Sequence, residues 1–347
     1  MRVVSLLPAA TEILHRLDAI DLLVARSHEC DHPDGDSADA RSLADLPILT
    51  AQRTRFTSAA EVDRLVTEAL SAGESLYTLD EDGLRRARPD LILTQDLCEV
   101  CSVDLASVRR AADSLDPPPR VLSLNPTTID AVIDDITRVG QAIGRADDAR
   151  RVVVDLTTRL DLAASAVPAF APGARVLFLE WPDPPFSPGH WTPQLIEWAG
   201  GEHPLNPTAP TGVPDGVTGP LNAERTAGKG ERVSFDRILA VDAETPFDRV
   251  ILCPCGLSLD ETRHEAARIF GEKGPLGALR AVTQEREAPA HDSLGSRVAL
   301  IDGNQMFSRP GPRLVDAFEW LVAWLHGRPE FAPPSFPAAP LASAVVA

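Results

Sequence analysis

The sequence predicts an α/β protein made of two blocks in which strands and helices alternate. In the first block, short apolar runs such as Leu91–Leu93 lie between helical patterns and end in polar turns. A second block with the same order of elements starts at Arg175. Between the blocks, residues 146–166 keep helical spacing without any Pro or Gly. We expect an N-terminal α/β lobe (1–145), a linker helix (146–168), a C-terminal α/β lobe (169–326) and a disordered tail (327–347).

The first block opens with a buried strand over residues 2–7, followed by a helix that begins at Pro8. Proline is favoured in the first turn of a helix, and Glu12 lies near the positive end of its dipole. Residues 22–26 form the next strand, and residues 32–57 are typical of a loop rich in Asp, Pro and Ser. The other predicted elements are helices over 60–72, 84–88 and 102–115, strands over 91–93 and 120–124, and a helix from Thr127 or Thr128 to about residue 143.

The long helix over 146–166 is either a stiff spacer of about 30 Å or an ordinary packed helix. The second block has a strand over residues 175–180 and a helix with Thr192 as its cap and Pro193 at its first position. Residues 201–231 resemble a surface loop, and strands over 250–252 and 297–301 alternate with helices over 260–270 and 313–325. Trp320 and Trp324 share a face of the last helix, so we expect them in the core.

Composition limits the function classes. The chain has 347 residues, 44% of them hydrophobic, a net charge of −18 and a pI of about 4.8. This acidity favours solubility and disfavours nucleic acid or an anionic membrane as a partner. No apolar run reaches the roughly 18 residues of a membrane span, so we expect no membrane insertion. The start has no leader pattern, so we expect a cytoplasmic protein.

Two cysteine pairs follow predicted strands: Cys98 with Cys101, and Cys253 with Cys255. Ligands of open α/β sheets bind at the carboxyl ends of strands, so the pairs suggest that both halves face one cleft. Paired thiolates can hold Zn or Cu(I), and Fe is a further candidate. Cys30, in the turn Ser27-His-Glu-Cys-Asp31, could join them. A redox dithiol and half-buried thiols near a pocket wall are the alternatives.

Several motifs resemble a known family. The opening Arg2-Val-Val-Ser-Leu-Leu-Pro-Ala-Ala-Thr-Glu-Ile-Leu14 and the later Pro89-Asp-Leu-Ile-Leu93 resemble class III substrate-binding proteins of vitamin B12, haem and iron–siderophore ABC importers. A narrower cytosolic subgroup, called cobalamin-binding proteins, is similar in the following motifs: Ser27-His-Glu-Cys-Asp31, Ser75-Leu-Tyr-x-Leu-Asp80, Gln95-x-Leu-Cys-x-Val-Cys101, Leu179-Glu-Trp-x-Asp-Pro184, Gly189-His-Trp-x-Pro193, Cys253-Pro-Cys-Gly256 and Phe307-Ser-Arg-Pro-Gly-Pro-Arg-Leu-Val-Asp316.

The resemblance implies two Rossmann-like lobes with mostly parallel sheets, joined by the long helix, with the ligand in the inter-lobe cleft. A corrin is flat and largely apolar with amides at its edge, so aromatic walls and a few hydrogen-bond donors would hold it. The candidate ligand-binding residues are Pro8, Thr11, His28, Tyr77, Trp181, His190, Trp191 and Arg309. His28 is either a ligand of cobalt or a hydrogen-bonded loop histidine, and Trp191 is either a pocket wall or a core anchor.

Arg309 and Arg313 either recognise a phosphate or carboxylate or bridge loop carbonyls. No phosphate-cradling glycine loop and no complete catalytic set is recognisable, so we do not expect an enzyme. The sequence predicts a binding protein for a corrinoid (cobalamin) or related metal complex. The alternative is a cytosolic metalloenzyme or metal carrier that uses the clustered Cys and His ligands. Without a secretion signal, an ABC permease is a doubtful partner.

Overall fold

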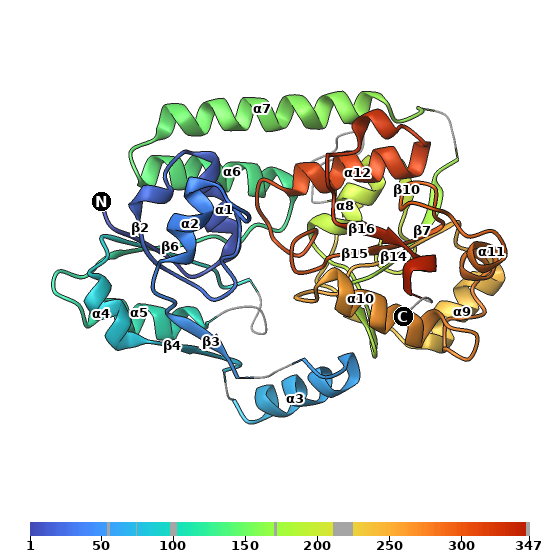
Figure 1. Cartoon of the computed structure of the whole chain (residues 1–347), viewed down its shortest axis with the longest axis horizontal. Helices are drawn as coiled ribbons and strands as arrows, with labels where there is room; N and C mark the ends of the chain where they lie inside the picture. The colour runs from blue at the N-terminus through green and yellow to red at the C-terminus, as the bar shows by residue number, and fades with distance from the viewer. Residues whose placement is uncertain (54–55, 74, 98–102, 170–171, 211–224, 345–347) are drawn as a thin grey trace. The chain divides into compact units, whose positions relative to one another are not determined.

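The computed structural model describes residues 1–53, 56–73, 75–97, 103–169, 172–210 and 225–344 (Figure 1). The chain divides into two compact units. The first unit comprises Met1–Thr57, Glu61–Pro126 and Ala131–Asp155, and the second comprises Ser58–Ala60, Thr127–Asp130 and Leu156–Ala347. The boundary between the last two segments lies inside the long helix α7 (Ala146–Ser165). Each unit contains a mostly parallel sheet, which confirms the predicted α/β class.

The sheet of the first unit has four parallel strands in the order β2-β1-β5-β6. Their bounds are Leu23–Arg26 for β2, Val3–Ser5 for β1, Leu91–Thr94 for β5 and Arg120–Ser123 for β6. β1 and β5 are buried throughout, as expected for central strands covered on both faces. The associated helices are α1 (Pro8–Arg16), α4 (Glu81–Ala87), α5 (Leu105–Asp113) and α6 (Ile129–Ala142). A short 3-10 turn, η1 (Ile20–Leu22), precedes β2.

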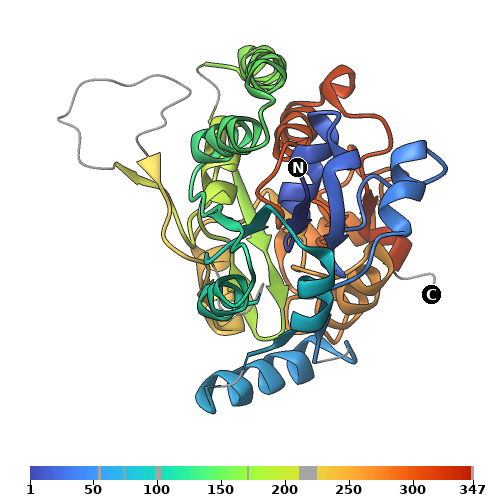
Figure 2. The same cartoon turned by 90° about the vertical axis from the view of Figure 1, so that its left-hand side faces the viewer.

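Residues 32–57, predicted as a loop, contain two regular elements. Helix α2 (Ala38–Ala44) is capped by Ser37, whose hydroxyl accepts from the Ala40 amide. Strand β3 (Thr50–Gln52) pairs antiparallel with β4 (Tyr77–Leu79), and helix α3 (Ala59–Ser71) lies between them in sequence. In Figures 1 and 2, α3 projects away from the sheet of the first unit. The loop prediction failed because both elements are short and β3 depends on a partner distant in sequence.

The sheet of the second unit has five strands in the order β10-β7-β14-β15-β16. The first four are parallel, namely β10 (Gly201–Glu202), β7 (Ala174–Leu179), β14 (Arg249–Leu252) and β15 (Val298–Ile301). The helices of this unit are α8 (Trp191–Trp198), α9 (Phe235–Glu244), α10 (Leu259–Phe270), α11 (Arg280–Glu287) and α12 (Leu314–His326). Trp320 and Trp324 of α12 are buried, as expected.

The C-terminal region differs from the predicted disordered tail. After a 3-10 turn, η2 (Pro329–Phe331), strand β16 (Ala338–Pro340) pairs antiparallel with β15, and η3 (Leu341–Ala344) follows. Leu341 and Ala344 are buried in the hydrophobic core of the second unit. The Pro- and Ala-rich composition misled the prediction, because a three-residue edge strand has too few residues to show a periodic pattern.

Segment 201–231 is more regular than a surface loop in its described part. Strands β11 (Ala209–Pro210) and β12 (Arg225–Thr226) pair with each other, and residues 211–224 lie outside the described residues. Strand β13 (Glu231–Arg232) pairs with β9 (Pro185–Ser187), which also pairs with β8 (Trp181–Pro182). Within the described residues, no helix combines the length and apolar character that a membrane crossing needs.

Candidate functional site

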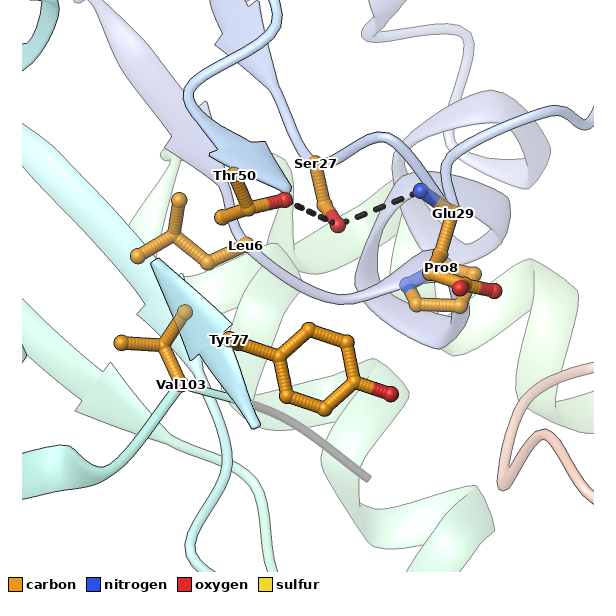
Figure 3. A pocket seen from close by; sticks show the side chains of 7 residues that line it. All are labelled: Leu6, Pro8, Ser27, Glu29, Thr50, Tyr77 and Val103. Atoms are coloured by element: carbon orange, nitrogen blue, oxygen red, sulfur yellow. Dashed lines mark hydrogen bonds between the residues drawn. The ribbon is translucent and has the colours of Figure 1, made fainter. Parts of the chain in front are cut away.

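In each sheet, the helix that follows a parallel strand begins near the edge at which that strand ends, here called the carboxyl edge. In the first unit this edge carries a very small hollow, with a cavity volume of about 10 Å³ (Figure 3). It is lined by Leu6, Pro8, Ser27, Glu29, Thr50, Tyr77 and Val103. Pockets for whole small molecules usually reach about 300–1,000 Å³. The hollow therefore has room for a group about the size of one water molecule, and not for a complete macrocycle.

His28 is fixed beside this hollow by Thr50. The backbone amide of His28 donates to Thr50 Oγ1 over 3.1 Å, and His28 Nδ1 lies 2.7 Å from the same oxygen. Ser27 Oγ lies 2.9 Å from Thr50 Oγ1 (Figure 3). His28 Nε2 lies 3.2 Å from Glu29 Oε1 but outside hydrogen-bond geometry, and it is covered from solvent. His28 would have to reorient before this nitrogen could reach a ligand.

Tyr77 belongs to β4 and its ring lies 5.7 Å from that of His28, measured between centroids. In Figure 3 the tyrosine ring spans the hollow, and its hydroxyl points away from Leu6 and Val103. Tyr77 is half-buried, so part of the ring is accessible. An aromatic ring beside a histidine and a carboxylate suits a ligand that is apolar on its face and polar at its edge.

Thr11 and Cys30 lie beneath the hollow rather than in it. Thr11 Oγ1 lies 2.9 Å from Ser5 Oγ and 3.0 Å from Cys30 Sγ. All three side chains are buried. Ser5 Oγ in turn donates to the carbonyl of Leu7, just before Pro8 opens α1. This network braces the turn between β1 and α1 from inside, whereas Pro8 itself lines the hollow.

In the second unit, the carboxyl edge carries the β8–β9 hairpin and the start of α8. Trp181 on β8 is half-buried, and its indole Nε1 donates to the carbonyl of Ala59, which belongs to the same compact unit. Trp191 is only 7% exposed, and its Nε1 donates over 2.7 Å to the carbonyl of Phe307. Trp191 therefore ties the start of α8 to the segment that follows β15.

His190 precedes α8 with a backbone φ of 55° and ψ of −120°. Helix α8 therefore begins at Trp191, with His190 as its N-terminal cap. The prediction of Thr192 as the cap and Pro193 as the first helical residue was wrong by two residues. The ring of His190 stacks on Trp191 with centroids 5.7 Å apart and an angle of 27° between planes. Burial, and secondarily the positive charge of Lys229, lowers the pKa of His190. Both causes favour the neutral imidazole, the form that can coordinate a metal.

Arg309 is 5% exposed and its Nη2 donates to Asn304 Oδ1 over 3.2 Å. Arg313 Nη1 donates to Gln305 Oε1 over 3.0 Å. Both arginines thus contact side chains of the loop that follows β15. Both contacts are to side-chain amide oxygens of this loop, and burial limits how much of Arg309 a ligand can reach.

The described cysteines differ in burial and in the unit to which they belong. Cys253 is buried, its thiol donates to the carbonyl of Met306 over 3.4 Å, and burial raises its pKa. Cys255 is exposed, because β14 ends at Leu252 and the chain enters a turn at Cys255. Cys30 is buried in the first unit, and Cys98 and Cys101 lie outside the described residues. Within the described part of the chain, no group of three or more His, Cys, Asp and Glu residues could hold a metal ion.

Sequence reasoning missed the residue that organises the first-unit hollow. Thr50 lies in the segment predicted as a loop, and it reaches His28 because residues 47–49 hydrogen-bond to the backbone of Arg26 at the end of β2. Ser27 and Glu29 belong to a quoted motif, but nothing local indicates that their side chains line a hollow. Leu49 and Thr50 are both buried and Ala51 is exposed, so the segment lacks the alternation that would mark a strand.

No protein-family model and no curated protein sequence matches the chain, whereas many solved structures match in fold. A periplasmic heme-binding protein from Pseudomonas aeruginosa is 18% identical, with a TM-score of 0.61 over 94% of this chain and 93% of that chain. The periplasmic vitamin B12 binding protein of Vibrio cholerae is 19% identical, with a TM-score of 0.58 over 93% of this chain and 96% of that chain.

A possible iron-binding (periplasmic solute-binding) protein from Staphylococcus epidermidis is 18% identical, with a TM-score of 0.58 over 94% of this chain and 98% of that chain. At such identities the likeness establishes the fold and not the ligand. The matches extend over nearly the whole length of each chain, so they include both units. The chain therefore has the two-lobe α/β fold of the periplasmic solute-binding proteins.

Proposed function

We propose that this chain is a binding protein for a corrinoid, such as cobalamin, or for a related tetrapyrrole metal complex. Three structural neighbours are described as binding heme, vitamin B12 and, possibly, iron. The observation that carries the proposal is the placement of half-buried aromatic and imidazole groups at the carboxyl edge of each sheet. Tyr77 with His28 has this placement in the first unit, and Trp181 with His190 has it in the second.

The chemistry of these groups suits a flat macrocycle. Aromatic rings pack against an apolar face, while imidazole, hydroxyl and carboxylate groups bind a polar rim or an axial position on the metal. The first-unit hollow of about 10 Å³ would accept only the small polar tip of a peripheral substituent, with Ser27, Glu29 and Thr50 as its polar lining. The bulk of the ring would then contact exposed parts of the aromatic side chains.

Binding is tested by titrating the pure chain with cyanocobalamin, diaquocobinamide and hemin, using calorimetry and the absorbance of each complex. We expect at least one corrinoid to bind with a dissociation constant well below 1 mM, which corresponds to only about 4 kcal/mol. The substitution Tyr77→Ala removes the ring beside the hollow, so we expect affinity to fall about two- to tenfold, because aromatic contacts contribute about 0.5–1.5 kcal/mol.

Phe331→Ala is the matched control, because this half-buried aromatic residue of η2 lies outside both groups of edge residues. The affinity of the Phe331→Ala variant for the corrinoid should equal that of the unaltered chain. If neither corrinoid nor hemin binds with a dissociation constant below about 1 mM, the proposal is wrong. Equal losses in the two variants would show that Tyr77 has no specific role.

A further inference from the structure

The segment around His190 has a backbone conformation that its residue types disfavour. His190 has a φ of 55° and Phe307 a φ of 61°, although neither is a glycine. Side chains with a Cβ rarely adopt such angles, and residues that do so are concentrated at functional sites. The two residues are connected, because Trp191 stacks on His190 and donates its indole hydrogen to the Phe307 carbonyl.

The surrounding backbone maintains this conformation. The His190 amide donates to the Gly228 carbonyl over 2.9 Å. A Cβ on Gly189 would lie 2.2 Å from the Gly230 amide nitrogen, so only glycine fits at that position. Close packing of the two segments therefore fixes the backbone on both sides of His190. If only folding mattered, glycine at position 190 would avoid the strain.

The ring of His190 is also distinctive among the histidines of the second unit. Within residues 172–210 and 225–344, it has no hydrogen-bond or ion-pair partner. By contrast, His203 is 1% exposed with Nδ1 on the Val176 carbonyl, and His326 Nε2 lies 2.8 Å from the Ala199 carbonyl. His264 is exposed on α10, and His291 is exposed ahead of β15. His190 is the half-buried histidine that precedes α8, at the carboxyl edge.

We propose that His190 coordinates the metal of the bound complex at an axial position, an inference that rests on the proposed function. An imidazole nitrogen gives its lone pair to the metal, and a metal-bound water leaves. The oxidation state of the metal does not change and no proton is transferred. Stacking on Trp191 fixes the plane of the imidazole, and the anchored indole holds the orientation of the ring while a ligand is absent.

The experiment uses diaquocobinamide, a corrinoid whose axial positions hold only water, bound to the full chain and reduced to Co(II). Electron paramagnetic resonance then reports the axial ligand, because one bound nitrogen splits each cobalt hyperfine line into a triplet. We expect this splitting in the unaltered chain and its loss in His190→Gly, together with an affinity at least about tenfold weaker, a loss of about 1.4 kcal/mol. Adding free imidazole to the variant should restore the triplet.

Unfolding in urea separates ligation from a structural role. Glycine relieves the strained backbone, so the variant should keep or raise its unfolding midpoint while it loses the nitrogen signal. His264→Ala, an exposed histidine of α10, is the control and should retain the triplet and the affinity. Cobinamide bound without a triplet, or a triplet that persists in His190→Gly, would overturn the assignment of His190 alone. No cobinamide binding by the unaltered chain would overturn the assignment together with the corrinoid proposal.

Discussion

His203 illustrates how a single buried residue can make stability depend on pH. It is 1% exposed, and its Nδ1 lies 3.1 Å from the Val176 carbonyl, which can only accept. Nε2 is buried and has no hydrogen-bond partner among the described residues. Burial is the main cause that lowers its pKa to about 4, from the usual histidine value of 6.5. The folded state therefore prefers the neutral ring, and protonation favours unfolding.

This pKa shift predicts an acid-sensitive second unit. The contribution of His203 is fully present above pH 6.5 and is lost as pH falls from there towards the folded pKa of about 4. Between pH 7 and pH 5 the loss should be about 2 kcal/mol in the free energy of unfolding. Urea unfolding followed by tryptophan fluorescence measures it, because all five tryptophans belong to the second unit.

The comparison variant is His203→Asn, whose amide can still donate to the Val176 carbonyl but does not titrate. We expect this variant to lose about 2 kcal/mol less than the unaltered chain over the same pH range. His264→Ala removes an exposed histidine and should follow the unaltered chain. Parallel pH dependences for the unaltered chain and His203→Asn would contradict the role of burial.

At the scale of elements, the central strands were predictable and the edges were not. Val3–Ser5, Leu91–Thr94, Ala174–Leu179, Arg249–Leu252 and Val298–Ile301 correspond to apolar runs, because strands in the middle of a parallel sheet have both faces covered. The edge strands β10 and β16 have only two and three residues, and distant partners define them. Helices α9 and α11 were also missed, since few of their residues are buried.

The candidate site divides in the same way. Pro8 and Tyr77 could be singled out because each belongs to a motif near the end of a strand or the start of a helix, and both line the first-unit hollow. Thr50 could not, because its contact with His28 exists only once residues 47–49 have bonded to the backbone of Arg26. The backbone angle of His190 has no local signal either, since close packing against Gly228 and Gly230 maintains it. The ligand-binding roles of all these residues remain predictions.

The ordered C-terminal segment should contribute measurably to stability. Leu341 is 2% exposed and belongs to the hydrophobic core of the second unit. Leu341→Ala removes buried methyl groups and leaves a cavity, so we expect the free energy of unfolding to fall by about 2–5 kcal/mol. Urea unfolding followed by tryptophan fluorescence reports the loss in the unit to which Leu341 belongs.

Leu162→Ala is the matched control, because it makes the same change on α7 at a leucine that is 58% exposed. Its effect should stay within about 0.5 kcal/mol. If both substitutions had equally small effects, the packing of η3 against the core would not contribute to stability. The tail would then be dispensable, as its composition suggested.

At the scale of the whole molecule, the chain cannot be cut into its two units at one linker. Ser58–Ala60 and Thr127–Asp130 belong to the second unit, although the residues on either side of each segment belong to the first. A fragment that starts at Leu156 would lack the Ala59 carbonyl that accepts from Trp181, and the Ile129 amide that donates to buried Gln194. Tests of binding therefore require the intact chain.

Hydrogen exchange on the intact chain shows which units contact a ligand. At a free cobinamide concentration of 100 times the dissociation constant, amides whose exchange requires ligand release should slow by about a hundredfold. We expect this slowing in the first unit over residues 5–11 and 27–30, and in the second unit over residues 180–191, which contain the edge residues proposed to bind. Helix α11, Arg280–Glu287, contains none of these residues, so it serves as the internal control for local protection.

Protection confined to residues 180–191 would mean that the first-unit hollow does not contact the ligand, because a group bound there must reduce the opening of the turn that begins at Pro8. Protection in both units, with α11 unchanged, would instead require that both carboxyl edges contribute to binding, since neither edge contains all the proposed groups.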